Sequence, residues 1–325
     1  MIKSLSKQIA LVYILSIFSP SLYAYKLGVG SCIDQNLKQD IWITIKKHNI
    51  DGFIFLGDNV YGDTSSGNLD RMKRAYAKQK TNFPSWLNKK DIIAIWDDHD
   101  YGVNDGGGDY KNKNEAKKLF IDFWKIPVSD VRRKRQGLYF ERSQLIEDKK
   151  IQYIVLDTRY FRSPLNGKTN NYQPNKSPYA TVLGNKQWKW FRKTLRNSEA
   201  EIIFILSSIQ VLATNHPYEK WANFPHERKR LLKEIKLASQ DKTIIALSGD
   251  RHRSGIYQND FFLELTSSSL NKASSITVEY DPLLIGRTYP EVNFGLIEID
   301  SKKNLISLSI RNKLGKELQS KIIKL

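Results

Sequence analysis

The chain has 325 residues, of which 40% are hydrophobic and 11% aromatic, and this composition excludes a disordered polypeptide. A single cysteine excludes an internal disulfide. Lysine and arginine exceed aspartate and glutamate by 52 to 34, which gives a formal net charge of +18. Such a charge favours nucleic acid, acidic lipid or phosphorylated polymers as partners. It also fits a soluble basic protein from a lysine-rich proteome, since the lysines are spread along the chain.

The first 24 residues have the pattern of a signal peptide. Two lysines precede an apolar run at residues 9–18, and Ala24 offers a small residue for cleavage. The apolar run is short for a membrane span. We therefore expect an exported protein, periplasmic or secreted, with one domain at residues 25–325. A retained N-terminal anchor is the alternative.

Short apolar runs rich in β-branched residues alternate with amphipathic stretches along the next part of the chain. The runs predicted as strands are 26–31, 52–56, 92–96, 151–156, 202–206 and 243–247. Helical spacing of apolar residues predicts helices over 184–196 and 225–239. Beyond residue 255 the pattern is strand-rich, at 261–266, 294–299 and 305–310. The pattern predicts an α/β domain in which two sheets pack together between helices.

Polar motifs follow four of the predicted strands. Loops at the carboxyl ends of strands are where α/β proteins gather their site residues. The four motifs are Gly30-Ser31-Cys32, Gly57-Asp58-Asn59-Val60-Tyr61, Asp97-Asp98-His99-Asp100 and Ser248-Gly249-Asp250-Arg251-His252. Carboxylates suit hard cations, while imidazole and thiolate suit transition metals, so the motifs predict a metal centre. The alternative is a set of solvated acidic turns.

Cys32 has three interpretations from the sequence. It is a buried structural thiol, a lipoprotein attachment site or a metal ligand. The apolar part of the leader ends more than ten residues upstream, which disfavours lipidation. The neighbouring motifs favour the ligand.

In this order, the motifs resemble the PhoD-like (alkaline phosphatase D) branch of the calcineurin-type metallophosphoesterase superfamily. The likeness covers roughly residues 26–275 and extends to Leu156-Asp157-Thr158-Arg159 and Trp221-Ala222-Asn223-Phe224-Pro225. It implies a four-layer αββα sandwich of the metallo-dependent phosphatase type. It also implies a metal-dependent phosphomonoesterase or phosphodiesterase that acts by a metal-bound hydroxide.

The resemblance also implies roles for individual residues by matched position. Two or more metal ions are implied, Fe3+ with Ca2+ or another divalent cation. The implied metal ligands are Cys32, Asp58, Tyr61, Asp98, Asp250 and His252. His99 matches the histidine that interacts with the phosphate or the leaving group, so we expect it to protonate the departing alkoxide or to stabilise it electrostatically. Asp97 and Asp100 are expected to orient their neighbours. Some family members have Asn where His252 stands, and an imidazole there favours a transition metal.

Two further residues are candidate substrate contacts. Arg159 follows a strand end and either binds substrate phosphate or pairs with an Asp. Asn104 either contacts substrate or, with its neighbour Asp105, ligates metal or forms a turn before three glycines. We expect a monomer without an obligate protein partner, acting on a small-molecule, phospholipid, nucleic-acid or anionic-polymer phosphoester. The alternative function is a basic cell-envelope protein that binds polyanions and has a structural metal site.

Overall fold

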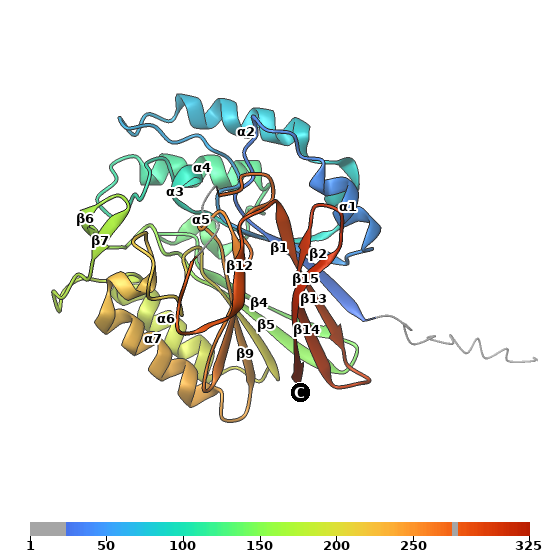
Figure 1. Ribbon diagram of the computed structural model, residues 1–325. Helices are drawn as coiled ribbons and strands as arrows, with labels where there is room; N and C mark the ends of the chain where they lie inside the picture. Colours follow the sequence, from blue (N-terminus) through green and yellow to red (C-terminus); the bar gives the residue numbers. More distant parts are fainter. Residues whose placement is uncertain (1–23, 275–278) are drawn as a thin grey trace, which may run out of the picture.

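Two large mixed β-sheets face each other in the computed structural model, which describes residues 24–274 and 279–325 (Figure 1). The predicted leader, residues 1–24, lies outside the described residues apart from Ala24. Helices cover the outer face of each sheet, so the fold has four layers in the order α, β, β, α. The expected αββα sandwich is therefore confirmed.

The first sheet has the strand order β15-β14-β13-β1-β2-β3. Its strands β1, β2 and β3 run parallel, while β13, β14 and β15 continue the sheet antiparallel. The bounds are β1 Tyr25–Gly30, β2 Gly52–Leu56, β3 Asp91–Ile95, β13 Asn293–Asp300, β14 Leu305–Asn312 and β15 Glu317–Lys324.

The second sheet has the order β12-β10-β11-β9-β8-β5-β4. Its four central strands, β11, β9, β8 and β5, run parallel. The bounds are β4 Phe140–Ile146, β5 Lys149–Val155, β8 Ile202–Leu206, β9 Thr243–Ser248, β10 Ser254–Asn259, β11 Phe262–Thr266 and β12 Leu284–Tyr289. A separate hairpin joins β6 Asn166–Lys168 to β7 Asn171–Gln173.

Alternation along the strands distributes their side chains between the layers. In β2, Phe53 and Phe55 pack among the helices on the outer face of the sheet, while Ile54 and Leu56 face the other sheet. In β8, alternate residues face the first sheet or the helices on the opposite side. The helices are α1 Ile41–Lys47, α2 Asp70–Asn82, α3 Asp98–Tyr101, α4 Lys113–Phe123, α5 Val131–Lys134, α6 Gly184–Arg196 and α7 Pro225–Ala238. Two 3-10 turns complete the set, η1 Ser85–Lys89 and η2 Trp221–Asn223.

The predicted strands and helices coincide with β1, β2, β3, β5, β8, β9, β11, β13, β14, α6 and α7, with ends displaced by two residues at most. In the part of the chain that is described, no helix has the length and apolarity to cross a bilayer. The division of the chain into a leader and one domain stays a prediction.

Candidate metal centre

The predicted ligands meet where the parallel strands of both sheets end. Cys32 follows β1, Asp58 follows β2, and Asp98 lies in the helical turn that follows β3. Asp250 and His252 follow β9 of the second sheet. Because parallel strands present their carboxyl ends at one edge, side chains far apart in sequence become neighbours.

Four of these residues have a strained backbone. The φ angles of Cys32, Asp58, Asp250 and His252 are 57°, 50°, 70° and 53°. Residues other than glycine rarely adopt this left-handed conformation, and it costs on the order of 1–3 kcal/mol where it persists. Such strain clusters at functional sites, so the backbone conformation identifies this edge of the sheets as a candidate functional site.

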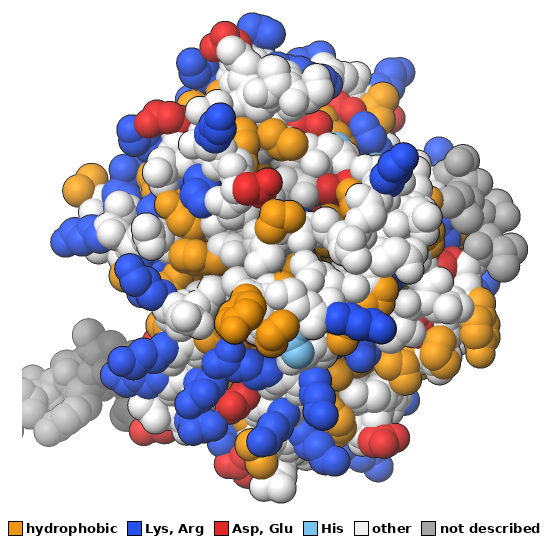
Figure 2. Space-filling view, turned by 90° about the vertical axis from the view of Figure 1, so that its left-hand side faces the viewer, with side chains coloured by type: hydrophobic (Ala, Val, Ile, Leu, Met, Phe, Trp, Pro, Cys, Tyr) orange, Lys and Arg blue, Asp and Glu red, His pale blue; other side chains and the backbone are white. Residues whose placement is uncertain are grey.

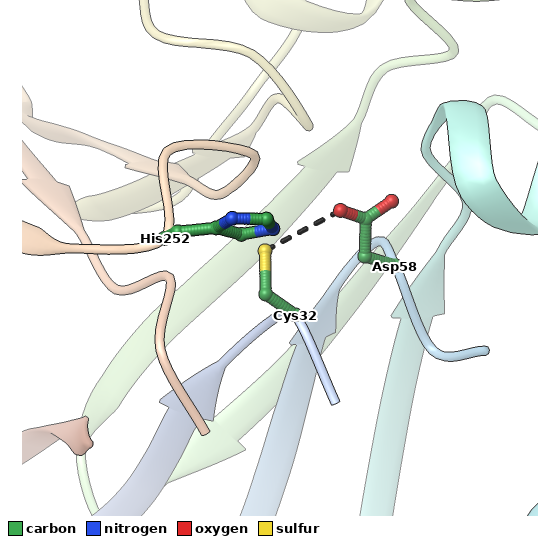
Figure 3. Close-up of side chains that lie close together, drawn as sticks. All are labelled: Cys32, Asp58 and His252. Carbon is green, nitrogen blue, oxygen red and sulfur yellow. Dashed lines mark hydrogen bonds between the residues drawn. The ribbon is translucent and has the colours of Figure 1, made fainter. Parts of the chain in front are cut away.

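One group of donors contains Cys32, Asp58 and His252, with one ligand atom from each within 4.8 Å of the others. Figure 3 shows the thiol and the carboxylate pointing toward each other with the imidazole beside them, and the Cys32 Sγ–Asp58 Oδ2 distance is 3.4 Å. The Tyr61 hydroxyl joins this group, at 2.9 Å from His252 Nε2 and 3.3 Å from Asp58 Oδ2. Thiolate, phenolate, imidazole and carboxylate together suit a transition metal.

Two more donor groups extend the centre along the same edge. Asp58, Asp98 and His99 form one, and Asp97, Asp98 and Asp250 form the other, each within the same 4.8 Å limit. Asp58 and Asp98 each belong to two groups, so each carboxylate would be available to more than one bound ion. The last group offers oxygen atoms only, which suits a hard cation such as calcium.

Two buried carboxylate oxygens in the centre accept no hydrogen bond from the part of the chain that the structure describes. Among the described residues, Asp97 Oδ2 and Asp98 Oδ1 have no hydrogen-bond partner. Orphaned buried carboxylate oxygens are costly, and a bound cation relieves that cost. The residues present therefore fit bound metal ions.

The electrostatics of the centre agree with this fit. Burial and then the neighbouring Cys32 raise the pKa of Asp58 well above its ordinary value. Burial and then the charges of Asp97 and Asp98 raise the pKa of Asp250 well above its own. Burial lowers the pKa of His252 to about 4, which keeps its imidazole neutral, as a ligand must be. A cation would offset the repulsion among these crowded carboxylates.

His99 has a carboxylate partner outside the predicted ligand set. Its Nδ1 lies 2.7 Å from Asp63 Oδ1, and its ring packs on Tyr61 with centroids 4.3 Å apart. Burial alone would lower the pKa of His99, but Asp98, Asp58 and the hydrogen bond to Asp63 raise it well above its ordinary value. A cationic imidazole of this kind can donate a proton.

Asp97 and Asp100 hold the acidic motif in place. The backbone N–H of Asp97 donates to Asp100 Oδ1 at 2.5 Å, and the Asn59 side-chain amide donates to Asp100 Oδ2. The Ser208 hydroxyl donates to Asp97 Oδ1 at 2.5 Å. These contacts fit the expected orienting role, while the donor group with Asp98 and Asp250 also places Asp97 among candidate ligands.

Arg159 is fully buried and pairs with acidic residues. Its Nε donates to Asp97 Oδ1 at 2.5 Å, and a terminal nitrogen donates to Glu219 Oε2. Glu219 also pairs with Arg162, at 2.8 Å. This placement favours the ion-pair interpretation of Arg159 over direct contact with substrate, because no part of its side chain reaches the surface.

A pocket of about 210 Å³ opens over the centre. Asn104 lines it, as the sequence allowed, and donates to Asp105 Oδ2 at 2.6 Å. Asp105 also accepts from the Tyr172 hydroxyl at 2.7 Å. Tyr172 belongs to the hairpin, which supplies one wall of the pocket with Thr169 and Asn170.

Three further residues support the site, and the sequence had already made one of them, Asp105, a candidate metal ligand or turn residue beside Asn104. Asp63 stands two residues beyond the motif Gly57-Asp58-Asn59-Val60-Tyr61, so its acidic side chain next to that motif was the available signal. Glu219 and Asp105 both line the pocket. Glu219 follows no predicted strand, and no local pattern distinguishes it from other acidic loop residues.

Comparisons with known proteins agree with the geometry. The model of the PhoD-like phosphatase family matches residues 27–292. A comparison with curated proteins finds no match. Similar solved structures include PhoD, with 16% identity, a TM-score of 0.68 and coverage of 93% of this chain and 69% of that one. GAP50, the anchor in the inner membrane complex of Plasmodium, has 10% identity, a TM-score of 0.62 and coverage of 93% and 89%. The purple acid phosphatase PPD1 from yellow lupin (Lupinus luteus) seeds has 12% identity, a TM-score of 0.58 and coverage of 93% and 54%. At these identities the likeness to each structure shows the shared fold.

Proposed function

Because the chain belongs to the PhoD-like phosphatase family, we propose that it hydrolyses phosphomonoesters and phosphodiesters at the metal centre, with His99 as general acid. Membership of the family makes the chain a phosphoesterase. The substrate and the roles of single residues belong to the proposal. One observation carries it: three overlapping donor groups lie beneath one pocket that His99 also lines.

The donor groups suggest which ions the chain holds. We assign ferric iron to the group with Cys32, Tyr61 and His252, because it contains thiolate, phenolate and imidazole. Asp97, Asp98 and Asp250 would hold calcium or another divalent cation. Bound metal ions would polarise the phosphoryl oxygens and lower the pKa of a coordinated water.

The chain's own residues then orient the substrate and move a proton. Asp63 holds Nδ1 of His99, which leaves Nε2 as the nitrogen that donates to the leaving oxygen. Asn104 and the hairpin residues Thr169 and Tyr172 offer polar contacts to the group beyond the phosphate. Arg159 acts through Asp97, whose carboxylate it holds in place.

Chelation coupled to a substrate panel tests the proposal. The purified protein is assayed on aryl phosphomonoesters and phosphodiesters before dialysis against chelator, after it, and after addition of iron and calcium. We expect hydrolysis to fall with the metals and to return with them. If the metal-loaded protein hydrolyses no phosphoester, that result would favour the alternative function, a polyanion-binding protein with a structural metal site.

Visible absorption tests whether the first metal is ferric iron. A phenolate or thiolate bound to ferric iron gives a visible charge-transfer band, so the iron-loaded protein should be coloured. Tyr61→Phe should bleach or shift the band while iron remains bound, and Tyr153→Phe, a buried tyrosine in β5, should leave it unchanged. A colourless iron-loaded protein would overturn the assignment.

We further propose that the chain is exported, into the periplasm or the medium. The leader pattern at residues 1–24 supports this proposal. N-terminal sequencing of the protein recovered from cell fractions tests it. A protein that retains Met1 and stays in the cytoplasm would contradict it.

A further inference from the structure

Seven cationic residues share the outward faces of α6 and α7, which lie side by side in Figure 1 and are in contact. Those on α6 recur at helical spacing, and those on α7 do the same. They are all exposed and consist of Lys186, Lys189, Lys193, Arg196, Lys229, Lys233 and Lys236. We call this surface the α6–α7 face. Figure 2 shows Lys and Arg gathered over the lower part of the molecule, where these helices lie.

Within each helix, the spacing places apolar residues on the side that faces the core and cationic residues on the side that faces solvent. Trp188, Phe191 and Leu195 of α6 are buried, as are Leu231 and Ile235 of α7. Residues three or four positions apart share one side of a helix, so the cations occupy the opposite side as two continuous stripes. The sequence alone spreads lysines along the chain, and the fold brings these together.

No exposed carboxylate on either helix offsets the charge. The two acidic residues of α6 and α7 are Glu227 and Glu234, and both are buried. Glu234 pairs with Arg196 at 3.0 Å and so links the two helices. Among the described residues, the five lysines from Lys186 to Lys233 on this face have no ion pair.

We propose that the α6–α7 face docks on the surface of an anionic phospholipid bilayer. Two adjacent helices present a broad face rather than a groove, and a broad cationic face matches a planar array of anionic headgroups. Leu237, 52% exposed, lies on the same side of α7 as Lys233 and offers an apolar side chain to the headgroup region. Each lysine near such a surface strengthens binding about fivefold.

This proposal does not rest on catalysis, so vesicle binding tests it directly. The probes are vesicles of phosphatidylcholine alone and vesicles that also contain phosphatidylglycerol. One variant changes five lysines of the face to Gln: Lys186→Gln, Lys189→Gln, Lys193→Gln, Lys229→Gln and Lys233→Gln. The matched control changes five exposed lysines of other elements: Lys38→Gln, Lys46→Gln, Lys47→Gln, Lys89→Gln and Lys125→Gln.

We expect the wild type to co-sediment with the anionic vesicles only. The face variant should bind at least about tenfold more weakly, and the control should stay within about threefold of the wild type. Unchanged circular dichroism and unchanged hydrolysis of a soluble phosphoester would show that both variants fold.

Three outcomes would overturn the proposal. The wild type does not bind anionic vesicles, or both variants lose binding equally, which would reflect net charge alone. In the third, the face variant binds vesicles normally but loses binding to single-stranded RNA, which would assign the face to an anionic polymer.

Discussion

His99 Nδ1 and Asp63 Oδ1 lie 2.7 Å apart, and both side chains are about four-fifths buried. The carboxylate therefore fixes the orientation of the imidazole and places a proton on Nδ1. A cationic His99 then carries its second proton on Nε2, the nitrogen left for the leaving group. This pair connects the acidic motif to the loop that follows β2, and it gives the proposed general acid a defined partner.

Asp63→Asn should lower kcat by about ten- to a hundredfold without changing metal content. Asp63 raises the pKa of His99, so its loss lowers that pKa. Because the general acid must be protonated, the alkaline limb of the rate profile should move to lower pH. Steady-state kinetics across pH measure this shift. Asp70→Asn, an exposed carboxylate on α2 that pairs with Lys73, is the control and should keep the wild-type profile. An unmoved limb in Asp63→Asn would remove Asp63 from the mechanism.

Glu219→Ala should lower the free energy of unfolding by about 3–5 kcal/mol. Glu219 is buried between Arg159 and Arg162, so its loss leaves buried cations without a full set of partners. Urea denaturation measures the change. Glu317→Ala removes an exposed partner of Arg311 and should cost less than about 1 kcal/mol. Equal losses in the two variants would contradict the buried network.

Gly57→Ala should disrupt the turn that presents Asp58. Gly57 has φ +99°, and a Cβ there would overlap Asp97 Cβ and lie 2.9 Å from the Asp97 backbone nitrogen. We expect loss of bound metal and a stability loss of about 2 kcal/mol or more. Gly286→Ala is the control, since φ is +69° there but a Cβ would meet only the Gln319 side chain, at 3.2 Å. It should cost about 1 kcal/mol and keep full activity, as measured by denaturation and turnover. Normal metal binding by Gly57→Ala would show that the turn tolerates a side chain.

Lys220 should make the free energy of unfolding depend on pH in the alkaline range. Burial and then the charge of Arg251 lower the pKa of Lys220 from 10.5 to about 8. Between these values the unfolded chain keeps a proton that the native protein loses, so stability rises with pH from about 8 to 10.5. Lys220→Met removes this contribution, and its unfolding free energy should rise less over that range than the wild-type value. Denaturation at a series of pH values measures both slopes, and parallel curves would contradict the account.

Much of the fold follows from sequence periodicity. The predicted bounds of β2, β8 and α6 coincide with the structure, because each combines a clear apolar pattern with turn residues at its ends. The strand β15, Glu317–Lys324, was not predicted, because its half-exposed polar residues obscure the alternation of buried and exposed side chains. The helix α2 was not predicted either, because only four of its residues are buried and its apolar pattern is therefore weak.

Some contacts of the site could also be predicted from the sequence, and others could not. Strand ends predicted the convergence of Cys32, Asp58, Asp98 and Asp250, because parallel topology alone brings such loops together. The pairing of Arg159 with Glu219 joins residues 60 positions apart through a loop, and no local pattern encodes that contact. The sequence therefore left two interpretations of Arg159 open, and only the packing distinguishes them.

The most direct test compares the metal content and the phosphoester turnover of the wild type with those of Asp58→Asn. Asp58 belongs to two of the donor groups, so we expect Asp58→Asn to remain folded, to bind fewer metal ions per chain and to lose hydrolysis. Asp148→Asn, a change at a carboxylate that is 70% exposed, should match the wild type in both measurements. If Asp58→Asn kept wild-type turnover, the proposed metal centre would not be the site of phosphoester hydrolysis.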